Sequence, residues 1–234
     1  MIIFFTKEIH GDYAFLIGDE ARHCSKVLRK RVGDNIIFTD GNGYFYTGRL
    51  TNVDKNNCKV SVMEKKKVEE KPYKLSIAIS PLKNPARFDW FVEKAVEIGI
   101  DSITPLICQR TEKKNIKAAR INNIIISASK QSLKAKFPVL NSSVSFNEFI
   151  ENTNPENTFL AHLNKKSVYL GKIDMHENEV VLLIGPEGDF TDEEISIAMQ
   201  SGIKTVTLGS SRLRTETAGV VACQIINTVY EMGK

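Results

Sequence analysis

Two polar segments in the C-terminal half of the chain contain the residues best suited to chemistry. The first is Ile184-Gly185-Pro186-Glu187-Gly188-Asp189-Phe190, and the second, LGSSRLRTETA, runs from Leu208 to Ala218. Each segment follows an apolar run and precedes a predicted helix. Loops of this kind present backbone and side-chain polar groups at the carboxyl edge of a parallel sheet, where α/β proteins bind ligands. We therefore expect the two loops to share a ligand pocket.

Simpler interpretations exist for both loops. The first could be a Gly-Pro turn followed by a capped helix, because Thr191 precedes Glu194 by three residues. In the second, Thr215 or Thr217 could cap the last helix, and Arg214 could pair with Glu216. A turn does not need two glycines around a Pro-Glu pair, and a cap does not need two arginines. We therefore favour a functional interpretation of both loops.

Basic residues near the N-terminus form a third group of interest. Arg22, Lys26, Arg29 and Lys30 have the spacing i, i+4, i+7 and i+8 within a helix predicted from Glu20 to Arg31. Such spacing places the four cations in one stripe, which suits the tracking of phosphates. A solvated helix face with no partner is an equally good interpretation of the stripe by itself.

The elements that position these residues fall into two groups. Residues 1–72 contain short strands with one helical insertion, which indicates a small β-barrel or sandwich. Residues 73–234 alternate strands with helices, which predicts an α/β domain whose mostly parallel sheet is covered on both faces. Within this domain Asn84 is expected to cap a helix running from Pro85 to Gly99. A charged stretch ending at Pro72 marks the expected boundary between two domains.

Composition and missing motifs exclude several classes of protein. No apolar run approaches the roughly 20 residues that span a bilayer, so we expect a cytosolic protein without membrane contact. The four cysteines are scattered and no histidines cluster near them, so neither a disulfide framework nor a metal site is expected. No G-x-G-x-x-G or phosphate-loop motif is present. The net charge of +4 barely favours an anionic partner.

Four segments, in order, resemble the RsmE family of bacterial enzymes that methylate N3 of a uridine in 16S ribosomal RNA. They are RHCSKVLRKRVGD, KNPARFDWFVEKAVEIGI, LLIGPEGDFTDEE and LGSSRLRTETAG. The resemblance covers nearly the whole chain. It implies a PUA-like β-barrel followed by a SPOUT-type methyltransferase domain with a C-terminal trefoil knot. It also implies a homodimer with S-adenosylmethionine bound at the subunit interface, and the small ribosomal subunit as partner.

The resemblance and the position of the strand TFLAHL together define the expected site residues. RNA contacts are expected from Arg22, His23, Lys26, Arg29 and Lys30. The residues expected to bind the cofactor come from three strand ends, namely His162, Leu163, Ile184, Gly185, Pro186, Glu187, Gly188, Leu208, Gly209, Leu213, Arg214, Thr215, Thr217 and Ala218. The chain departs from the usual family pattern at Asn84, at Ser129 to Lys134, and at Asp189, where a glycine is usual.

Methyl transfer to uracil N3 requires removal of the N3 proton and stabilisation of the resulting anion. Arg214 is a poor base because its guanidinium keeps its protons, but it can stabilise that anion. Glu216 is the first candidate for proton acceptor, and Glu187 is the second. Two other functions fit the same sequence, namely a non-catalytic factor that binds ribosomal RNA during assembly and a SPOUT methyltransferase acting on another RNA.

Overall fold

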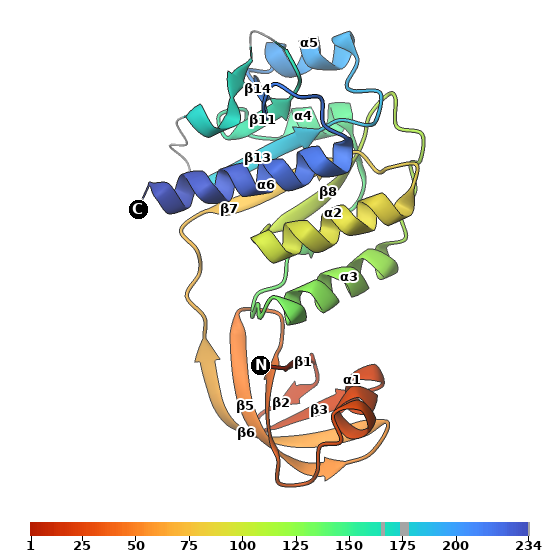
Figure 1. Ribbon diagram of the computed structural model, residues 1–234, viewed down its shortest axis with the longest axis vertical. Helices are drawn as coiled ribbons and strands as arrows, with labels where there is room; N and C mark the ends of the chain where they lie inside the picture. The colour runs from red at the N-terminus through yellow and green to blue at the C-terminus, as the bar shows by residue number, and fades with distance from the viewer. Residues whose placement is uncertain (165–166, 174–177, 234) are drawn as a thin grey trace. The chain divides into compact units, whose positions relative to one another are not determined.

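The computed structural model describes residues 1–164, 167–173 and 178–233. The described chain divides into two compact units. The first unit contains Met1–Glu70 together with Ile126–Phe137, and the second contains Lys71–Ile125 and Pro138–Lys234. Figure 1 labels the helices and strands of both units.

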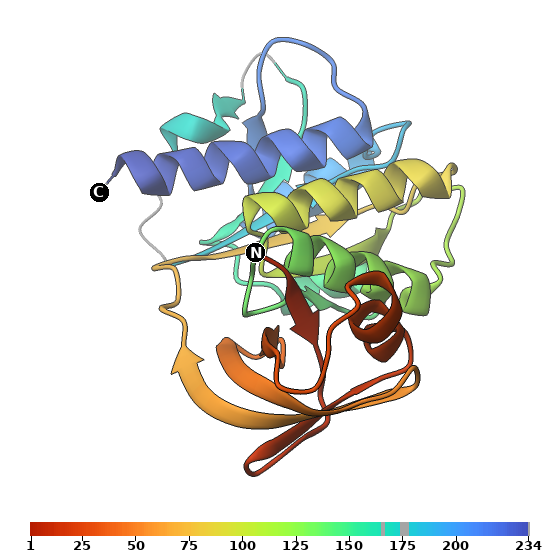
Figure 2. The ribbon, with the colours of Figure 1, turned by 60° about the horizontal axis from the view of Figure 1, so that its bottom comes forward.

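One six-stranded sheet forms the first unit, in the order β1-β4-β5-β6-β3-β2. Its long strands β5 and β6 curve strongly, which gives the sheet the curled form seen in Figure 2. Inward-facing side chains such as Leu16, Phe38 and Val60 are fully buried in its core. The predicted small β domain is thus confirmed, with strands β1 (Ile3–Phe5), β2 (Ile9–His10), β3 (Tyr13–Ile17), β4 (Asn35–Thr39), β5 (Tyr44–Val53) and β6 (Asn57–Lys67).

The helical insertion of the first unit is shorter than predicted. Helix α1 (Asp19–Arg22) continues into one π-helical turn, η1 (His23–Val27), and the prediction of a regular helix to Arg31 is wrong. The Leu28 N–H donates to the His23 carbonyl five residues back, so this turn is wider than an α-helical turn. Arg29 lies beyond the helix with a φ of 52°. The four cations therefore do not form the regular helical stripe that their spacing predicted.

Residues 126–137 pack into the first unit although they are distant in sequence. The Ala135 carbonyl accepts hydrogen bonds from the Thr39 hydroxyl and the Gly43 N–H, both at 3.0 Å. The ring of Phe137 lies 5.0 Å from that of Phe5. It also lies against Gly41, where an added Cβ would be 3.1 Å from the ring. The sequence pattern alone did not predict this packing.

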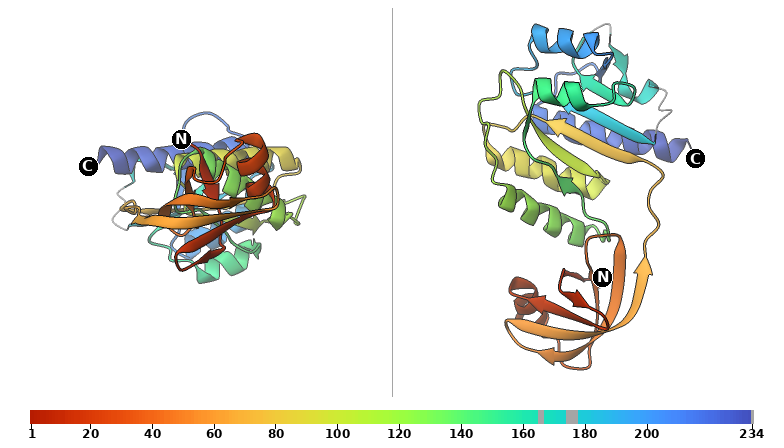
Figure 3. Two further views of the ribbon diagram at one scale, coloured as in Figure 1. Left: turned by 90° about the horizontal axis from the view of Figure 1, so that it is seen from below. Right: turned by 180° about the vertical axis from the view of Figure 1, so that it is seen from behind.

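The second unit contains a parallel sheet in the order β10-β8-β7-β13-β11-β14-β12, and β9 pairs with β8. Helices α2 (Pro85–Ile98) and α6 (Thr215–Met232) cover one face, and α4 (Phe146–Asn152) and α5 (Asp192–Gln200) cover the other (Figures 1 and 3). The predicted parallel α/β architecture is confirmed. Its strands are β7 (Lys74–Ile79), β8 (Ser102–Ile107), β9 (Val139–Leu140), β10 (Val144–Ser145), β11 (Thr158–Ala161), β12 (Val168–Tyr169), β13 (Glu179–Ile184) and β14 (Lys204–Thr207).

The start of helix α2 was predicted correctly from the sequence, and the start of helix α6 was not. Helix α2 begins as predicted, because the Asn84 side chain accepts a hydrogen bond from the Ala86 N–H. Helix α6 begins at Thr215, three residues earlier than predicted, and Arg214 is its N-cap residue without a side-chain cap. The simpler interpretation, in which Thr215 or Thr217 caps this helix, is therefore excluded. The shift places Glu216 inside the first helical turn.

Two further helices complete the described structure. Helix α3 (Ala118–Gln131) contributes to both units, and the short 3₁₀ helix η2 (Leu170–Lys172) belongs to the second. Among the described residues, every helix is too short or too polar to cross a bilayer.

Candidate active site

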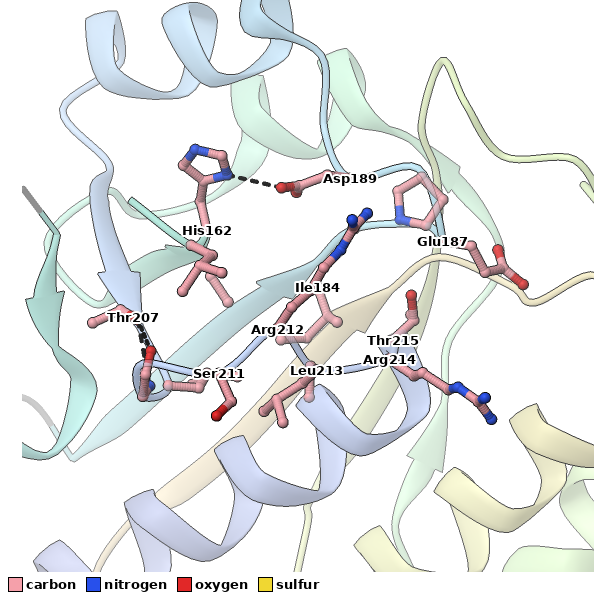
Figure 4. A pocket seen from close by; sticks show the side chains of 17 residues that line it. His162, Ile184, Glu187, Asp189, Thr207, Ser211, Arg212, Leu213, Arg214 and Thr215 are labelled. Atoms are coloured by element: carbon pink, nitrogen blue, oxygen red, sulfur yellow. Dashed lines mark hydrogen bonds and ion pairs between the residues drawn. The ribbon is translucent and has the colours of Figure 1, made fainter. Parts of the chain in front are cut away.

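A pocket of about 610 Å³ lies at the carboxyl ends of β11, β13 and β14 (Figure 4). The two loops selected from the sequence form most of its wall, as expected for neighbouring parallel strands that end at the same sheet edge. Its lining residues are Ala161, His162, Leu163, Ile184, Gly185, Pro186, Glu187, Asp189, Thr207, Leu208, Gly209, Ser211, Arg212, Leu213, Arg214, Thr215 and Ala218.

The loop after β13 turns sharply around Gly185 and Asp189. A Cβ at Gly185 would lie 3.1 Å from the ring and the backbone nitrogen of Phe190, so the residue must be small. The Asp189 N–H donates to the Pro186 carbonyl at 2.9 Å, and Asp189 adopts a φ of 62°. Aspartate tolerates this left-handed conformation better than most residues. The turn leaves backbone atoms at the pocket wall.

Helix α5 holds the far end of this loop through the predicted capping box. The Thr191 hydroxyl accepts from the Glu194 N–H at 3.2 Å, and Glu194 Oε2 accepts from the Thr191 N–H at 2.9 Å. Glu194 Oε1 also accepts from the Gln109 N–H at 2.8 Å, which links the loop after β8 to the same helix. Because the two bonds of the capping box are buried and the third is partly buried, they give the loop a defined position.

The loop after β14 is shaped by Gly209. Its φ of 144° is accessible to glycine but not to residues with a side chain. The Thr207 hydroxyl donates to the Gly209 carbonyl at 2.7 Å, so the strand end and the turn are bonded to each other (Figure 4). The chain then passes through Arg212 and Leu213 to Arg214, where helix α6 begins.

A hydrogen-bonded pair connects two of the pocket's loops. His162 Nδ1 lies 3.0 Å from Asp189 Oδ2, and Asp189 Oδ1 accepts from the Phe190 N–H at 2.8 Å (Figure 4). His162 itself is anchored by its N–H, which donates to the Val206 carbonyl at 2.9 Å. The expectation that His162 lines the pocket agrees with its position. The sequence did not indicate its partner, because 27 residues separate the pair.

Most residues expected to bind the cofactor lie together in this pocket. Twelve of the fourteen line it, and the exceptions are Gly188 and Thr217. The Gly188 carbonyl instead accepts from the Arg110 guanidinium at 2.6 Å. Sequence reasoning missed five lining residues, namely Ala161, Asp189, Thr207, Ser211 and Arg212. Four of them adjoin a predicted residue along the chain, so position next to a predicted residue was the available signal.

The two carboxylates considered as proton acceptors occupy different environments. Glu216 is 7% exposed and does not line the pocket. Its Oε1 lies 3.7 Å from Arg87 Nε, and its buried Oε2 has no hydrogen-bond partner among the described residues. Glu187 is exposed, lines the pocket and accepts from the Lys83 N–H at 3.1 Å. Arg87, rather than Arg214, is thus the arginine paired with Glu216.

Lys83 carries a positive charge close to Glu187, whose carboxylate accepts from the Lys83 N–H. Its Nζ lies 2.9 Å from Glu112 Oε2, and this hydrogen bond with Glu112 raises the pKa of the exposed lysine. The ammonium therefore stays protonated beside the loop that carries Glu187.

The residues expected to contact RNA are confined to the first unit, and they differ in exposure. Arg22, Lys26 and Arg29 are exposed, whereas His23 and Lys30 are half-buried. Arg22 is paired with Asp19 at 3.1 Å, and the His23 ring lies 5.7 Å from that of Phe4. His23 thus contributes to packing, while the three exposed cations are available to a ligand.

Comparison with known protein families identifies the class of protein to which this chain belongs. The family model of the RNA methyltransferase domain matches residues 69–227, and that of the RNA methyltransferase PUA domain matches residues 16–63. The first match contains every residue of the pocket, and the second lies within the curled sheet and its helical insertion. The fold and the site therefore define an RNA methyltransferase with a PUA domain.

Individual similar proteins show which family of RNA methyltransferases this chain belongs to. A crystal structure of a probable rRNA-methyltransferase from Porphyromonas gingivalis is 36% identical, with a TM-score of 0.92 and complete coverage of both chains. Ribosomal RNA small subunit methyltransferase E from Neisseria gonorrhoeae, bound to S-adenosyl methionine, is 30% identical, with a TM-score of 0.88 and 97% coverage of each chain. The enzyme of that name from Synechocystis sp. is 30% identical over 91% of this chain and 72% of its own length. The chain belongs to the ribosomal RNA small subunit methyltransferase E family, which confirms the resemblance noted in the sequence.

Proposed function

We propose that this protein transfers a methyl group from S-adenosylmethionine to N3 of a uridine in the 16S ribosomal RNA of the small subunit. The observation that carries the proposal is the pocket itself, because its two loops contain the family motifs and meet at one sheet edge. The names of the relatives support ribosomal RNA of the small subunit as the substrate class.

The residues of the pocket fit S-adenosylmethionine. The volume of about 610 Å³ is in the range of small-ligand sites. Gly185 and Gly209 leave backbone polar groups uncovered, and Leu163, Ile184 and Leu208 supply apolar surface. These residues, with the other lining residues of the three loops, would hold the cofactor. When bound, it supplies an electrophilic methyl group on a sulfonium.

Arg214 is proposed to stabilise the negative charge of the uracil ring. Its guanidinium remains charged, it is exposed, and it lies on the opposite side of the pocket from His162 and Asp189 in Figure 4. A cation at the rim is well placed to contact a base that enters from solvent. The target base must be unpaired or flipped out of its stack to enter the pocket.

The proton acceptor for N3 is proposed to be a carboxylate. Glu216 was the first candidate from the sequence, but its carboxylate is buried beside Arg87 and does not line the pocket. Glu187 is exposed and lines it, so its carboxylate can reach a ligand without rearrangement of helix α6. The structure therefore favours Glu187, and we retain Glu216 as the second candidate.

Three further features belong to the proposal. Arg22, Lys26 and Arg29 of the first unit would contact ribosomal phosphates, and His23 and Lys30 would support that segment. A homodimer and a C-terminal trefoil knot are predictions from the family resemblance. We place the protein in the cytoplasm, where ribosomes assemble.

The decisive experiment combines the purified protein and S-adenosylmethionine with small ribosomal subunits that lack the modification. Nucleoside mass spectrometry should then detect 3-methyluridine in 16S ribosomal RNA. Cofactor binding without this product would indicate another RNA substrate. The absence of both binding and product would favour a non-catalytic assembly factor.

A further inference from the structure

The ionisable side chains of the pocket nearly balance in charge. Five of the described lining residues are ionisable, and they are Glu187, Asp189, Arg212, Arg214 and His162. The two arginines and the two carboxylates sum to a formal charge of zero. Removal of one carboxylate would leave a cationic pocket. Whether the pocket attracts a positively charged ligand therefore depends on which carboxylate lies beside that ligand.

The two carboxylates are held differently. Glu187 is exposed, and in Figure 4 its carboxylate points away from His162. The Asp189 side chain is 42% exposed and is fixed by bonds from the Phe190 N–H and from His162. Among the described residues, His162 is its hydrogen-bonded side-chain partner, and neither Arg212 nor Arg214 is paired with it. The negative charge of Asp189 is thus oriented at the pocket wall, and among the described residues no arginine forms an ion pair with it.

The proposed reaction changes the charge of the bound ligand. The bond between the methyl carbon and sulfur breaks, a bond to uracil N3 forms, and the electron pair remains on sulfur. The N3 proton passes to the acceptor carboxylate. The sulfonium therefore becomes a neutral thioether, so cofactor and product differ by one positive charge. A fixed carboxylate distinguishes two ligands of this kind because it attracts only the charged sulfur.

We infer that Asp189 is a specificity-determining residue that favours the sulfonium cofactor over its thioether product, and that His162 orients its carboxylate. This inference rests on the proposed function. Asp189 itself lines the pocket, so its carboxylate lies at the wall of the space that the cofactor would fill. The preference for the cofactor also promotes exchange of the product after transfer.

The test is calorimetric titration of S-adenosylmethionine and S-adenosylhomocysteine into the full chain at pH 8. In Asp189→Asn, the Kd of the cofactor should rise by about tenfold, while that of the product changes by less than about twofold. Asparagine preserves the size of the side chain and tolerates the positive φ of this position. His162→Gln should shift the ratio of the two Kd values in the same direction by a smaller factor.

Two further variants separate charge from structure. Asp192→Asn makes the same chemical change three residues away, at an exposed position outside the pocket, and should leave both Kd values unchanged. Asp189→Gly removes the charge and relieves any backbone strain, so it should reproduce the ratio of Asp189→Asn. Equal weakening of both ligands, or no change in either, would overturn the inference. If the unmodified protein binds neither ligand, the proposed function itself fails.

Discussion

The first and second units of this chain present their candidate functional residues in different ways. In the first unit, Arg22, Lys26 and Arg29 are exposed side chains on a short helix and the loop that follows it. In the second unit, the pocket depends on backbone turns at Gly185, Asp189 and Gly209. Exposed cations act mainly through charge, whereas a pocket requires a defined backbone path. Function should therefore tolerate single substitutions of the exposed cations in the first unit better than substitutions at the pocket of the second.

Arg214→Ala should produce the largest effect. Loss of a charge that stabilises the reacting base is expected to lower turnover about 100-fold, with the Kd of S-adenosylmethionine changed less than about threefold. Single-turnover methylation and calorimetry measure the two quantities. Arg49→Ala, which removes an exposed arginine from the first unit, is the control for general loss of positive charge. Equal turnover in Arg214→Ala and the parent would remove Arg214 from the mechanism.

Gly219→Ala should have the next largest effect. An added Cβ would lie 2.5 Å from the Phe91 ring, so α6 must move away from α2. The change should destabilise the second unit by about 2 kcal/mol, although alanine by itself favours a helix by about 1 kcal/mol over glycine. Urea unfolding followed by the fluorescence of Trp90, the chain's single tryptophan, reports on α2. A more stable variant would show that the two helices separate without cost.

Gly48→Ala provides the matched test in the first unit. Its Cβ would lie 2.4 Å from Val60, so the local clash is comparable to that at Gly219. Because each unit has its own core, we expect the first unit to lose stability while the transition reported by Trp90 stays in place. A shift of the Trp90 transition would show that the two units unfold as one.

Arg22→Ala and Lys26→Ala should have the smallest effects. Each should weaken binding of 16S ribosomal RNA by about threefold. Each should also lower the slope of log binding constant against log salt concentration by the equivalent of about one phosphate contact. Binding of S-adenosylmethionine should not change, because these residues belong to the other unit. Filter binding over a range of salt concentrations measures both parameters. Lys66→Ala, at an exposed position on β6, is the control, and an equal loss there would indicate nonspecific attraction.

Local signals in the sequence predicted much of the second unit. Asn84 before Pro85 marked the start of α2, and the Thr191 and Glu194 pair marked that of α5. These motifs act within one helical turn, so their residues are enough to define them. The alternation of apolar strands with helices predicted the parallel sheet, and that sheet brings the loops after β13 and β14 to one edge. The position of the pocket follows from the same pattern.

Features that depend on distant contacts, and one unusual local turn, escaped prediction. Residues 126–137 pack with the first unit through Ala135 and Phe137, whose partners Thr39 and Phe5 lie far earlier in the chain. The π-helical turn at His23 also differs from the regular helix that the spacing of the cations suggested. The burial of Glu216 against Arg87 depends on how α6 packs on α2. None of these features leaves a periodic signal in the sequence.

The sequence by itself determined the two kinds of architecture, the motifs of the two pocket loops and the family. Short-range spacing and residue type are enough for these, because caps, turns and strand alternation are local properties. Only the tertiary structure decided which charged groups meet. The pairing of β11 with β13 brings His162 to Asp189, and the packing of α6 on α2 turns Glu216 away from the pocket. Electrostatic partners are chosen by distance in space, which separation along the chain does not encode.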